Sequence, residues 1–315
     1  MMNAKSIMKV SLLFAIATIP IIVTPAIAQD KQVLFIAGAP SHGFGNHEHL
    51  GGSKLLAQTI NDADVGVTAH VISGWPENEN AFDQIDAVVI YSNGGTNHPV
   101  VDHIDEFQKV MDRGVGLVTL HYAVEVPKGE PGDRFMEWQG GYFETDWSVN
   151  PFWTARINML PDHPVTNGVE PFEINDEWYY HMRFAEGMNG VTTILTDLPP
   201  QESLSRDDGP HSNNPYVREA VLENKEPQHV AWVHERPNKG RSFGFTGGHY
   251  HWNWANDQFR RLVTNAIVWS AHAEVPVYGI QFDSINVLEL SKLTDDPVPD
   301  DWDYQEIQDR LDASN

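Results

Sequence analysis

The sequence predicts an α/β fold with a doubly wound, mostly parallel sheet. Short runs of β-branched and aromatic residues alternate with amphipathic helices along the first half of the chain. These runs are almost continuously apolar, which is typical of parallel strands that helices cover on both faces. The 315 residues are enough for one large domain of this kind or for two small ones.

The first half of the chain contains four expected strands and two expected helices. The strands are predicted at residues 32–38, 66–72, 85–91 and 116–121. The helices are predicted near residues 52–61 and over residues 99–113, where apolar residues recur at helical spacing. Gly114 follows the second helix and suits its left-handed cap position.

The second half of the chain is less regular. Residues 127–153 are rich in Gly, Pro and aromatic residues, and we expect them to form a large ordered excursion over the sheet. Further strands are expected at residues 156–160, 172–175, 191–195 and 229–234. The last core strand is expected at 241–246, followed by a helix from about 256 to 272 and a loosely packed acidic tail with a helix at 304–311.

The N-terminus has the three-part layout of a secretory signal peptide. Lys5 and Lys9 precede an apolar run at residues 10–23, and Ala26-Ile27-Ala28 forms a small-x-small cleavage signal. We therefore expect residues 1–28 to be removed and the mature protein to be secreted or periplasmic, without a membrane segment. The alternative, an uncleaved membrane anchor, would need a longer apolar run.

Composition excludes several function classes. The chain has no cysteine, so it has no thiolate metal site, no cysteine nucleophile and no disulfide. The formal charge is −24, and the basic surface that nucleic acid requires is missing. Neither G-x-x-x-x-G-K-[ST] nor G-x-G-x-x-G occurs, so no nucleotide is expected.

Histidines follow three of the predicted strands. They are His47 and His49 after the first strand, His121 after the fourth, and His249 and His251 after the last. Ligands of open parallel sheets bind beyond the carboxyl ends of the strands, so these side chains are expected at one edge. Each histidine also has a purely structural interpretation, as a helix-turn residue or a hydrogen-bonded core residue.

Imidazole and carboxylate without thiolate suit zinc, manganese or a similar divalent metal. The metal-ligand candidates are His47, His49, His249 and His251. A His-x-His pair in extended backbone places both rings on one face. The segment DEWYYHM adds Glu177, and the catalytic candidates are His121, Glu177 and His249.

Aromatic side chains are abundant near these segments and could stack on the C–H faces of a sugar. The substrate-binding candidates are Tyr122, Glu125, Trp147, Trp178, Tyr180 and Trp252. The alternative is that these aromatic residues form local core.

Several segments together resemble the ThuA-like (trehalose utilisation) family: VLFIAG with SHGFGNHEH, DAVVIYSNGG, GVGLVTLHYAVE, NDEWYYHMRF and GRSFGFTGGHYHWNW. The resemblance implies a flavodoxin-like, class I glutamine amidotransferase-like sheet with aromatic-rich insertions. It implies a domain at residues 29–275, followed by an acidic tail at 276–315. In that superfamily, His121 stands where the nucleophilic thiol would be and His249 at the late histidine, but a chain without cysteine cannot transfer glutamine nitrogen.

The resemblance also implies a role in disaccharide and glycoside utilisation, including the handling of 3-keto sugars, and some members of the family hold a divalent metal. We therefore predict a metal-assisted lyase or hydrolase that acts on a keto-glycoside with His and Glu as acid–base groups. Two alternatives stay open: a non-catalytic periplasmic sugar-binding or accessory protein, and a metal-dependent esterase or amidase. The expected partner is a small carbohydrate, and the C-terminal helix and tail offer a surface for a homo-oligomer.

Overall fold

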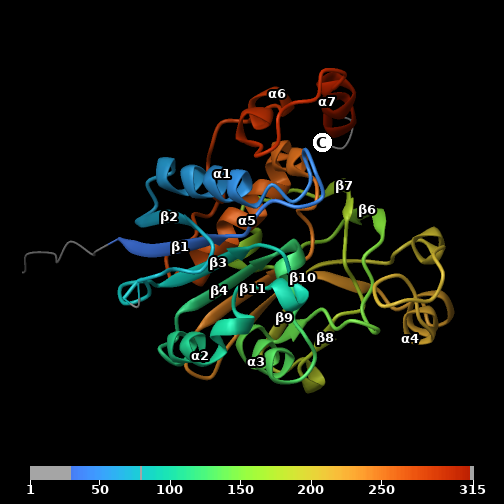
Figure 1. Cartoon of the computed structure of the whole chain (residues 1–315), viewed down its shortest axis with the longest axis horizontal. Coiled ribbons are helices and arrows are strands. Elements are labelled where there is room, and N and C mark those ends of the chain that lie inside the picture. The colour runs from blue at the N-terminus through green and yellow to red at the C-terminus, as the bar shows by residue number, and fades with distance from the viewer. Residues whose placement is uncertain (1–29, 79, 313–315) are drawn as a thin grey trace, which may run out of the picture.

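The computed structural model describes residues 30–78 and 80–312, so the predicted signal peptide lies outside the described residues. A seven-stranded sheet forms the centre of the molecule (Figure 1). In spatial order its strands are β2 (Val67–Ser73), β1 (Lys31–Ala37), β3 (Ala87–Tyr91), β4 (Gly116–Leu120), β11 (Arg241–Phe245), β10 (Gln228–Glu235) and β9 (Val191–Asp197).

Five adjacent strands of this sheet are parallel. β1 pairs with β2 and β3, and β4 pairs with β3 and β11, all in parallel register. β10 runs antiparallel to both β11 and β9. The order β2-β1-β3-β4-β11 is that of a flavodoxin-like sheet, so the predicted fold class is confirmed.

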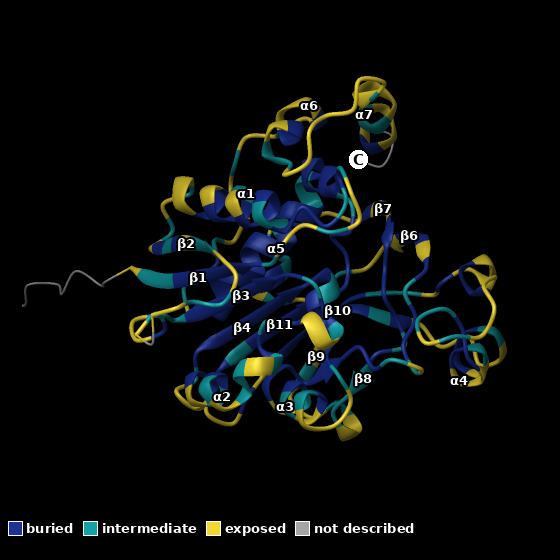
Figure 2. Cartoon of the chain, in the orientation of Figure 1, coloured by how far each residue is buried: buried dark blue, intermediate teal, exposed yellow. Residues whose placement is uncertain are grey.

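Helices cover both faces of the sheet, and the central strands β1, β3, β4 and β11 are accordingly buried along most of their length (Figure 2). The edge strands β2 and β9 are partly exposed. α1 (His49–Asp62) and α5 (Asp257–Ser270) lie on one face, and α2 (Ile104–Asp112) and α3 (Glu130–Gln139) lie on the other (Figure 1). Alternate residues of a strand point to opposite faces, so Val33 and Phe35 belong to the first core, whereas Leu34 and Ile36 belong to the second.

The excursion expected at residues 127–153 contains α3, which covers the sheet and ends at Gly140 in a left-handed conformation. Two small antiparallel sheets follow. β5 (Gly141–Tyr142) pairs with β8 (Arg183–Phe184), and β6 (Phe152–Ile157) pairs with β7 (Phe172–Glu177). β6 begins four residues before the expected strand. The β6–β7 pair lies on the side of the sheet away from the start of β1 (Figure 1).

The C-terminal segment packs against the core more closely than the loose tail that the sequence suggests. It contains α6 (Val287–Leu290) and α7 (Tyr304–Asp312). The remaining helix, α4 (Pro215–Arg218), lies in the connection between β9 and β10. Val287 and Leu290 are fully buried, and the Trp302 ring lies 5.1 Å from that of Trp252. Within residues 30–78 and 80–312, no helix is long and apolar enough to cross a membrane.

Candidate metal centre

Four buried side chains from four distant segments meet beyond the carboxyl ends of the central strands. His47 precedes α1, His121 directly follows β4, and His249 follows β11. The fourth is Glu177, the last residue of β7. One ligand atom of each lies within 4.8 Å of those of the others. Parallel strands end at a common edge, which is why the loops after β1, β4 and β11 converge.

The contacts within this group, which we call the His47 cluster, are short. His47 Nε2 lies 3.0 Å from His121 Nε2 and 3.0 Å from His249 Nδ1. Glu177 Oε2 lies 3.4 Å from His121 Nε2 and 3.1 Å from His249 Nδ1. The four groups therefore surround one point and do not form a chain.

Neighbouring groups fix which ring nitrogen carries the proton in two of the histidines. His121 Nδ1 donates to the carbonyl oxygen of Thr246 at 2.9 Å, because that oxygen can only accept. Ser41 donates its hydroxyl proton to Asn93 Oδ1, so it accepts from His47 Nδ1 at 3.0 Å. In the neutral rings, both Nε2 atoms then carry lone pairs, and the two lone pairs face each other.

The carboxylate in the cluster is held in its charged form. Burial raises the pKa of Glu177, but the close contacts with His121 and His249 outweigh this effect and lower the pKa to about 2. Burial and the adjacent His121 and His249 lower the pKa of His47, so this ring resists protonation. The cluster thus offers a neutral imidazole at His47 and an anion at Glu177.

Two of the histidines adopt backbone conformations that are uncommon for residues other than glycine. The φ angles of His47 and His121 are +50° and +54°. His121 begins a 3₁₀ turn (His121–Val124) immediately after its strand. Strain of this kind is concentrated at functional sites, and here it turns the His121 ring toward the cluster.

Asp176, which precedes Glu177, positions the loop that carries His249. Its buried carboxylate accepts backbone N–H groups from Gly248 at 2.6 Å and His249 at 3.1 Å, with Tyr250 at 3.4 Å. Successive strand residues point to opposite faces, so Asp176 binds the backbone of this loop while Glu177 contacts the His249 ring.

The cluster reaches solvent beside His42 and Phe152. The exposed His42 ring lies 4.0 Å from that of His47, and its Nδ1 also contacts Ser41 Oγ at 2.9 Å. Phe152 is 49% exposed, and its ring lies 4.9 Å from that of His249. On the buried side of the cluster, the hydroxyl of Tyr179 lies 3.2 Å from His121 Nε2. Burial raises the pKa of Tyr179, so its hydroxyl stays protonated.

Tyr122 and Glu125 lie on another side of the cluster. The Tyr122 ring is 5.9 Å from that of His47. Glu125 is buried and accepts hydrogen bonds from His211 Nε2 at 2.9 Å and Thr145 at 3.1 Å. The pKa of His211 is raised by this hydrogen bond with Glu125, which favours the charged ring.

The structure does not bring the other two predicted ligands, His49 and His251, into the cluster. His49 is the first residue of α1, and its Nδ1 donates to the carbonyl oxygen of Ala39 at 2.9 Å. His251 begins a 3₁₀ turn (His251–Ala255), so the 249–251 pair is not extended and the two rings diverge. His251 Nε2 instead donates to the carbonyl oxygen of Leu290 at 3.2 Å.

Most of the predicted aromatic contacts lie in the core. Trp178 and Tyr180 are fully buried, and Trp252 packs against Phe44 and the C-terminal segment. Trp147 is half-buried, stacks on His181 and carries the Arg183 guanidinium 3.5 Å from its ring centroid. These side chains support the segments around the cluster.

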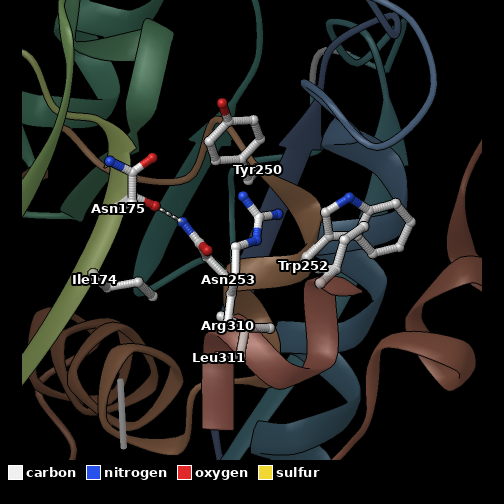
Figure 3. A pocket seen from close by; sticks show the side chains of 8 residues that line it. Ile174, Asn175, Tyr250, Trp252, Asn253, Arg310 and Leu311 are labelled. Carbon is white, nitrogen blue, oxygen red and sulfur yellow. Dashed lines mark hydrogen bonds between the residues drawn. The ribbon is translucent and has the colours of Figure 1, made fainter. Parts of the chain in front are cut away.

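A separate cavity of about 50 Å³ lies between the core and α7 (Figure 3). Tyr250, Asn253 and Arg310 project into it, and Asn253 donates to the backbone oxygen of Asn175. None of the four cluster residues lines this cavity, so it is distinct from the candidate metal centre.

Sequence reasoning missed His42, Phe152, Asp176 as a positioning residue, Tyr179 and His211. His42 and Asp176 adjoin predicted site segments, so their proximity was a usable signal. No sequence signal pointed to Phe152 and His211, because their positions depend on how the β6–β7 pair and the loop before α4 fold back toward the sheet.

The residues of the cluster fit a divalent metal ion. Three imidazole nitrogens and one carboxylate oxygen, without thiolate, form a donor set that suits zinc, manganese and similar ions. Two of the histidines are held by hydrogen bonds at Nδ1, the usual way in which a protein orients a ligating ring. A metal ion between the two Nε2 atoms would bind both lone pairs, which otherwise accept protons from neighbouring donors such as the Tyr179 hydroxyl.

Comparison with known proteins agrees with this fold. No curated protein matches the chain. Two solved structures described as ThuA-like proteins, from Bacteroides uniformis ATCC 8492 and Parabacteroides merdae ATCC 43184, superpose with TM-scores of 0.51 and 0.50. Each is 15% identical and covers 77% of this chain, with 91% and 90% of its own length matched. The sequence profile of the ThuA trehalose utilisation family matches residues 32–270, and the chain therefore belongs to that family.

Proposed function

We propose that this chain is a secreted, divalent-metal-assisted lyase or hydrolase that cleaves the glycosidic bond of a keto-glycoside. One observation carries the proposal: the His47 cluster gathers three imidazoles and an ionised carboxylate at the carboxyl edge of the sheet, where this fold binds ligands. Membership of a trehalose utilisation family supports a carbohydrate as the substrate.

The reaction needs little more than a base and a group that stabilises an oxyanion. A keto group at C3 of the sugar acidifies the C–H bond at C2. Removal of that proton allows the C1–O bond to break, and the leaving oxygen then takes up a proton. A divalent metal held by His47, His121, His249 and Glu177 would supply Lewis acidity toward a carbonyl oxygen.

The exposed His42 is suited to be the base. Its Nδ1 donates to Ser41 Oγ, so Nε2 carries the lone pair that accepts a proton. Burial and the neighbouring His249 lower the pKa of His42, which keeps the ring neutral at pH 7. Tyr179, which stays protonated beside His121, supplies a hydrogen-bond donor inside the cluster. Acid–base groups of this kind contribute roughly 10²- to 10⁴-fold to rate.

The test is incubation of the purified mature protein with 3-keto-trehalose, with zinc or manganese supplied, and chromatography of the released keto-sugar and glucose. We expect Glu177→Gln and His249→Gln to lose at least about 10²-fold in rate. His49→Gln is the matched control, because His49 is adjacent and buried but outside the cluster.

Two results would overturn the proposal. Saturable sugar binding without product after long incubation would indicate a non-catalytic binding protein. Cleavage of simple esters or amides, but not of keto-glycosides, would indicate a metal-dependent esterase or amidase with the same centre.

We also infer that export delivers the chain to the periplasm or the medium. The basic residues, apolar run and Ala26-Ile27-Ala28 of the N-terminus support this. Mass spectrometry of the exported protein should give a mature chain that begins at Gln29, and a chain retained with residue 1 in the membrane fraction would contradict it.

A further inference from the structure

The outward face of the β6–β7 pair leads directly away from the His47 cluster. In this antiparallel pair Phe152 lies opposite Glu177, Thr154 opposite Asn175, and Arg156 opposite Glu173. Directly opposed residues point to the same face. Glu177, a cluster residue, is therefore the first member of a row that continues through Asn175 to Glu173. The distance along the strand from Glu177 to Glu173 is about 13 Å, at about 3.3 Å per residue.

A groove of about 370 Å³ runs along this face. One wall is formed by Phe152, Thr154, Arg156 and Asn175, and the other by Asp197 at the end of β9 and the following segment, which includes Glu202. Its volume is in the range of sites that hold small organic ligands. Asp197 accepts the backbone N–H of Arg156 at 2.8 Å, which joins the two walls.

Phe152 connects the groove to the cluster. Its ring lines the groove and also lies 4.9 Å from the His249 ring. Glu177 and His249 are the most exposed cluster residues, with side chains 12% and 7% exposed, whereas the side chain of His121 is fully buried. A ligand that reaches the cluster at these two residues therefore passes Phe152.

The chemistry of the groove selects a neutral, polyhydroxylated ligand. Phe152 is an exposed aromatic face, and sugar C–H groups stack on such faces. Asn175, Thr154 and the carboxylates offer hydrogen-bond donors and acceptors. Arg156 already pairs with Glu173 at 3.0 Å, and Asp197 and Glu202 add negative charge, so a phosphorylated sugar would be repelled.

We propose that this groove binds the second sugar unit of a neutral disaccharide whose first ring lies against the His47 cluster at Glu177 and His249. The inference rests on the proposed function, because it assigns the leaving sugar of that reaction to the groove. It makes the protein selective for disaccharides over glycosides with a small aglycone.

The test compares two ligands with the same first ring, trehalose and methyl α-D-glucoside, by isothermal titration calorimetry with the full mature chain. We expect Phe152→Ala and Arg156→Ala to weaken trehalose binding by about 3- to 10-fold. Methyl α-D-glucoside should bind all of these proteins equally. Tyr278→Ala is the matched control, since Tyr278 is 80% exposed and lies outside the groove.

Three outcomes would overturn the proposal. Trehalose binding could be insensitive to both groove variants, both ligands could be weakened equally, or neither trehalose nor any other glucose disaccharide could bind. Failure of the proposed function is a separate result. Groove-dependent trehalose binding without turnover of 3-keto-trehalose would leave the groove established and the lyase or hydrolase activity refuted.

Discussion

The Nε2 atoms of His47 and His121 lie 3.0 Å apart, although the Nδ1 atom of each ring already faces a hydrogen-bond acceptor. Two neutral imidazoles cannot hydrogen-bond through two lone pairs. Either a metal ion lies between them, or protons satisfy the lone pairs, supplied by the Tyr179 hydroxyl and His249 Nδ1 or by double protonation of one ring. The two explanations differ in what the purified protein contains.

We expect the mature protein to hold about one divalent ion, measured by inductively coupled plasma mass spectrometry after purification without immobilised metal or chelator. His47→Gln should retain little of it, because it removes a ligand atom from the centre of the cluster. His49→Gln should retain the metal ion, since the His49 ring lies outside the cluster and is hydrogen-bonded to the carbonyl oxygen of Ala39. No metal in the wild type, even after zinc or manganese is added, would mean that protons and not a metal ion satisfy the two lone pairs.

Asp176→Asn tests whether the Asp176 carboxylate positions the loop that carries His249. The amide offers one acceptor oxygen and no charge to the N–H groups of Gly248 and His249, so the His249 ring should move away from Glu177. We expect metal affinity to fall by roughly 10- to 100-fold, as for other groups that orient metal ligands.

Competition with a chromogenic chelator measures that affinity in Asp176→Asn. Asn175→Asp is a suitable companion variant, because it adds a charge at an exposed side chain that contacts Thr154 and not the loop that carries His249. Equal metal affinity in Asp176→Asn and the wild type would show that the loop holds its shape without the carboxylate.

The sheet and the edge that carries the cluster can be predicted from the sequence because both depend on local patterns. Buried parallel strands are continuous apolar runs, and residues just after them must lie at one edge. These two rules are sufficient to bring His47, His121 and His249 to the same edge. Glu177 comes instead from the DEWYYHM segment, as a catalytic candidate, and its place in the cluster depends on the β6–β7 pair.

The choice within each histidine pair could not be predicted, because it depends on backbone conformation. His49 is turned away by the start of α1, and His251 by the start of a 3₁₀ turn. The register of β6 against β7, which sets Phe152 opposite Glu177, is likewise a tertiary property. Composition also does not distinguish a core tryptophan such as Trp178 from one that stacks on a ligand.

Gly51→Ala tests the contact between α1 and the C-terminal segment. A Cβ at Gly51 would overlap the backbone oxygen of Leu293. In an open helix this change would stabilise the fold by up to about 1 kcal/mol, but here the tail must move. We expect the free energy of unfolding to fall by about 1–3 kcal/mol, measured by urea titration.

Lys54→Ala, on the exposed side of the same helix, should change stability by less than about 0.5 kcal/mol. The tail also donates the Asp295 N–H to Glu48 Oε2 at 2.8 Å, next to His47. Gly51→Ala should therefore also weaken metal binding. A stabilised Gly51→Ala protein would show that the tail does not press on α1.

His98 should make the fold sensitive to acid independently of the cluster. It is buried against Phe135, its Nδ1 accepts the backbone N–H of Val100 at 3.2 Å, and burial lowers its pKa to about 3. In the unfolded chain the pKa is near its ordinary value of 6.5. Between about pH 6.5 and 3, His98 therefore binds a proton in the unfolded state but stays neutral in the folded state.

The contribution of His98 to stability is complete above about pH 6.5 and is lost as the pH falls, by about 1.4 kcal/mol per pH unit. His98→Gln removes the titrating ring, so its free energy of unfolding should fall less steeply between pH 6.5 and 4.5 than that of the wild type. Urea titrations at several pH values measure both slopes, and the other histidines cancel in the difference. Parallel pH dependence in the two proteins would mean that His98 is protonated within the fold, and that its surroundings accommodate the charge.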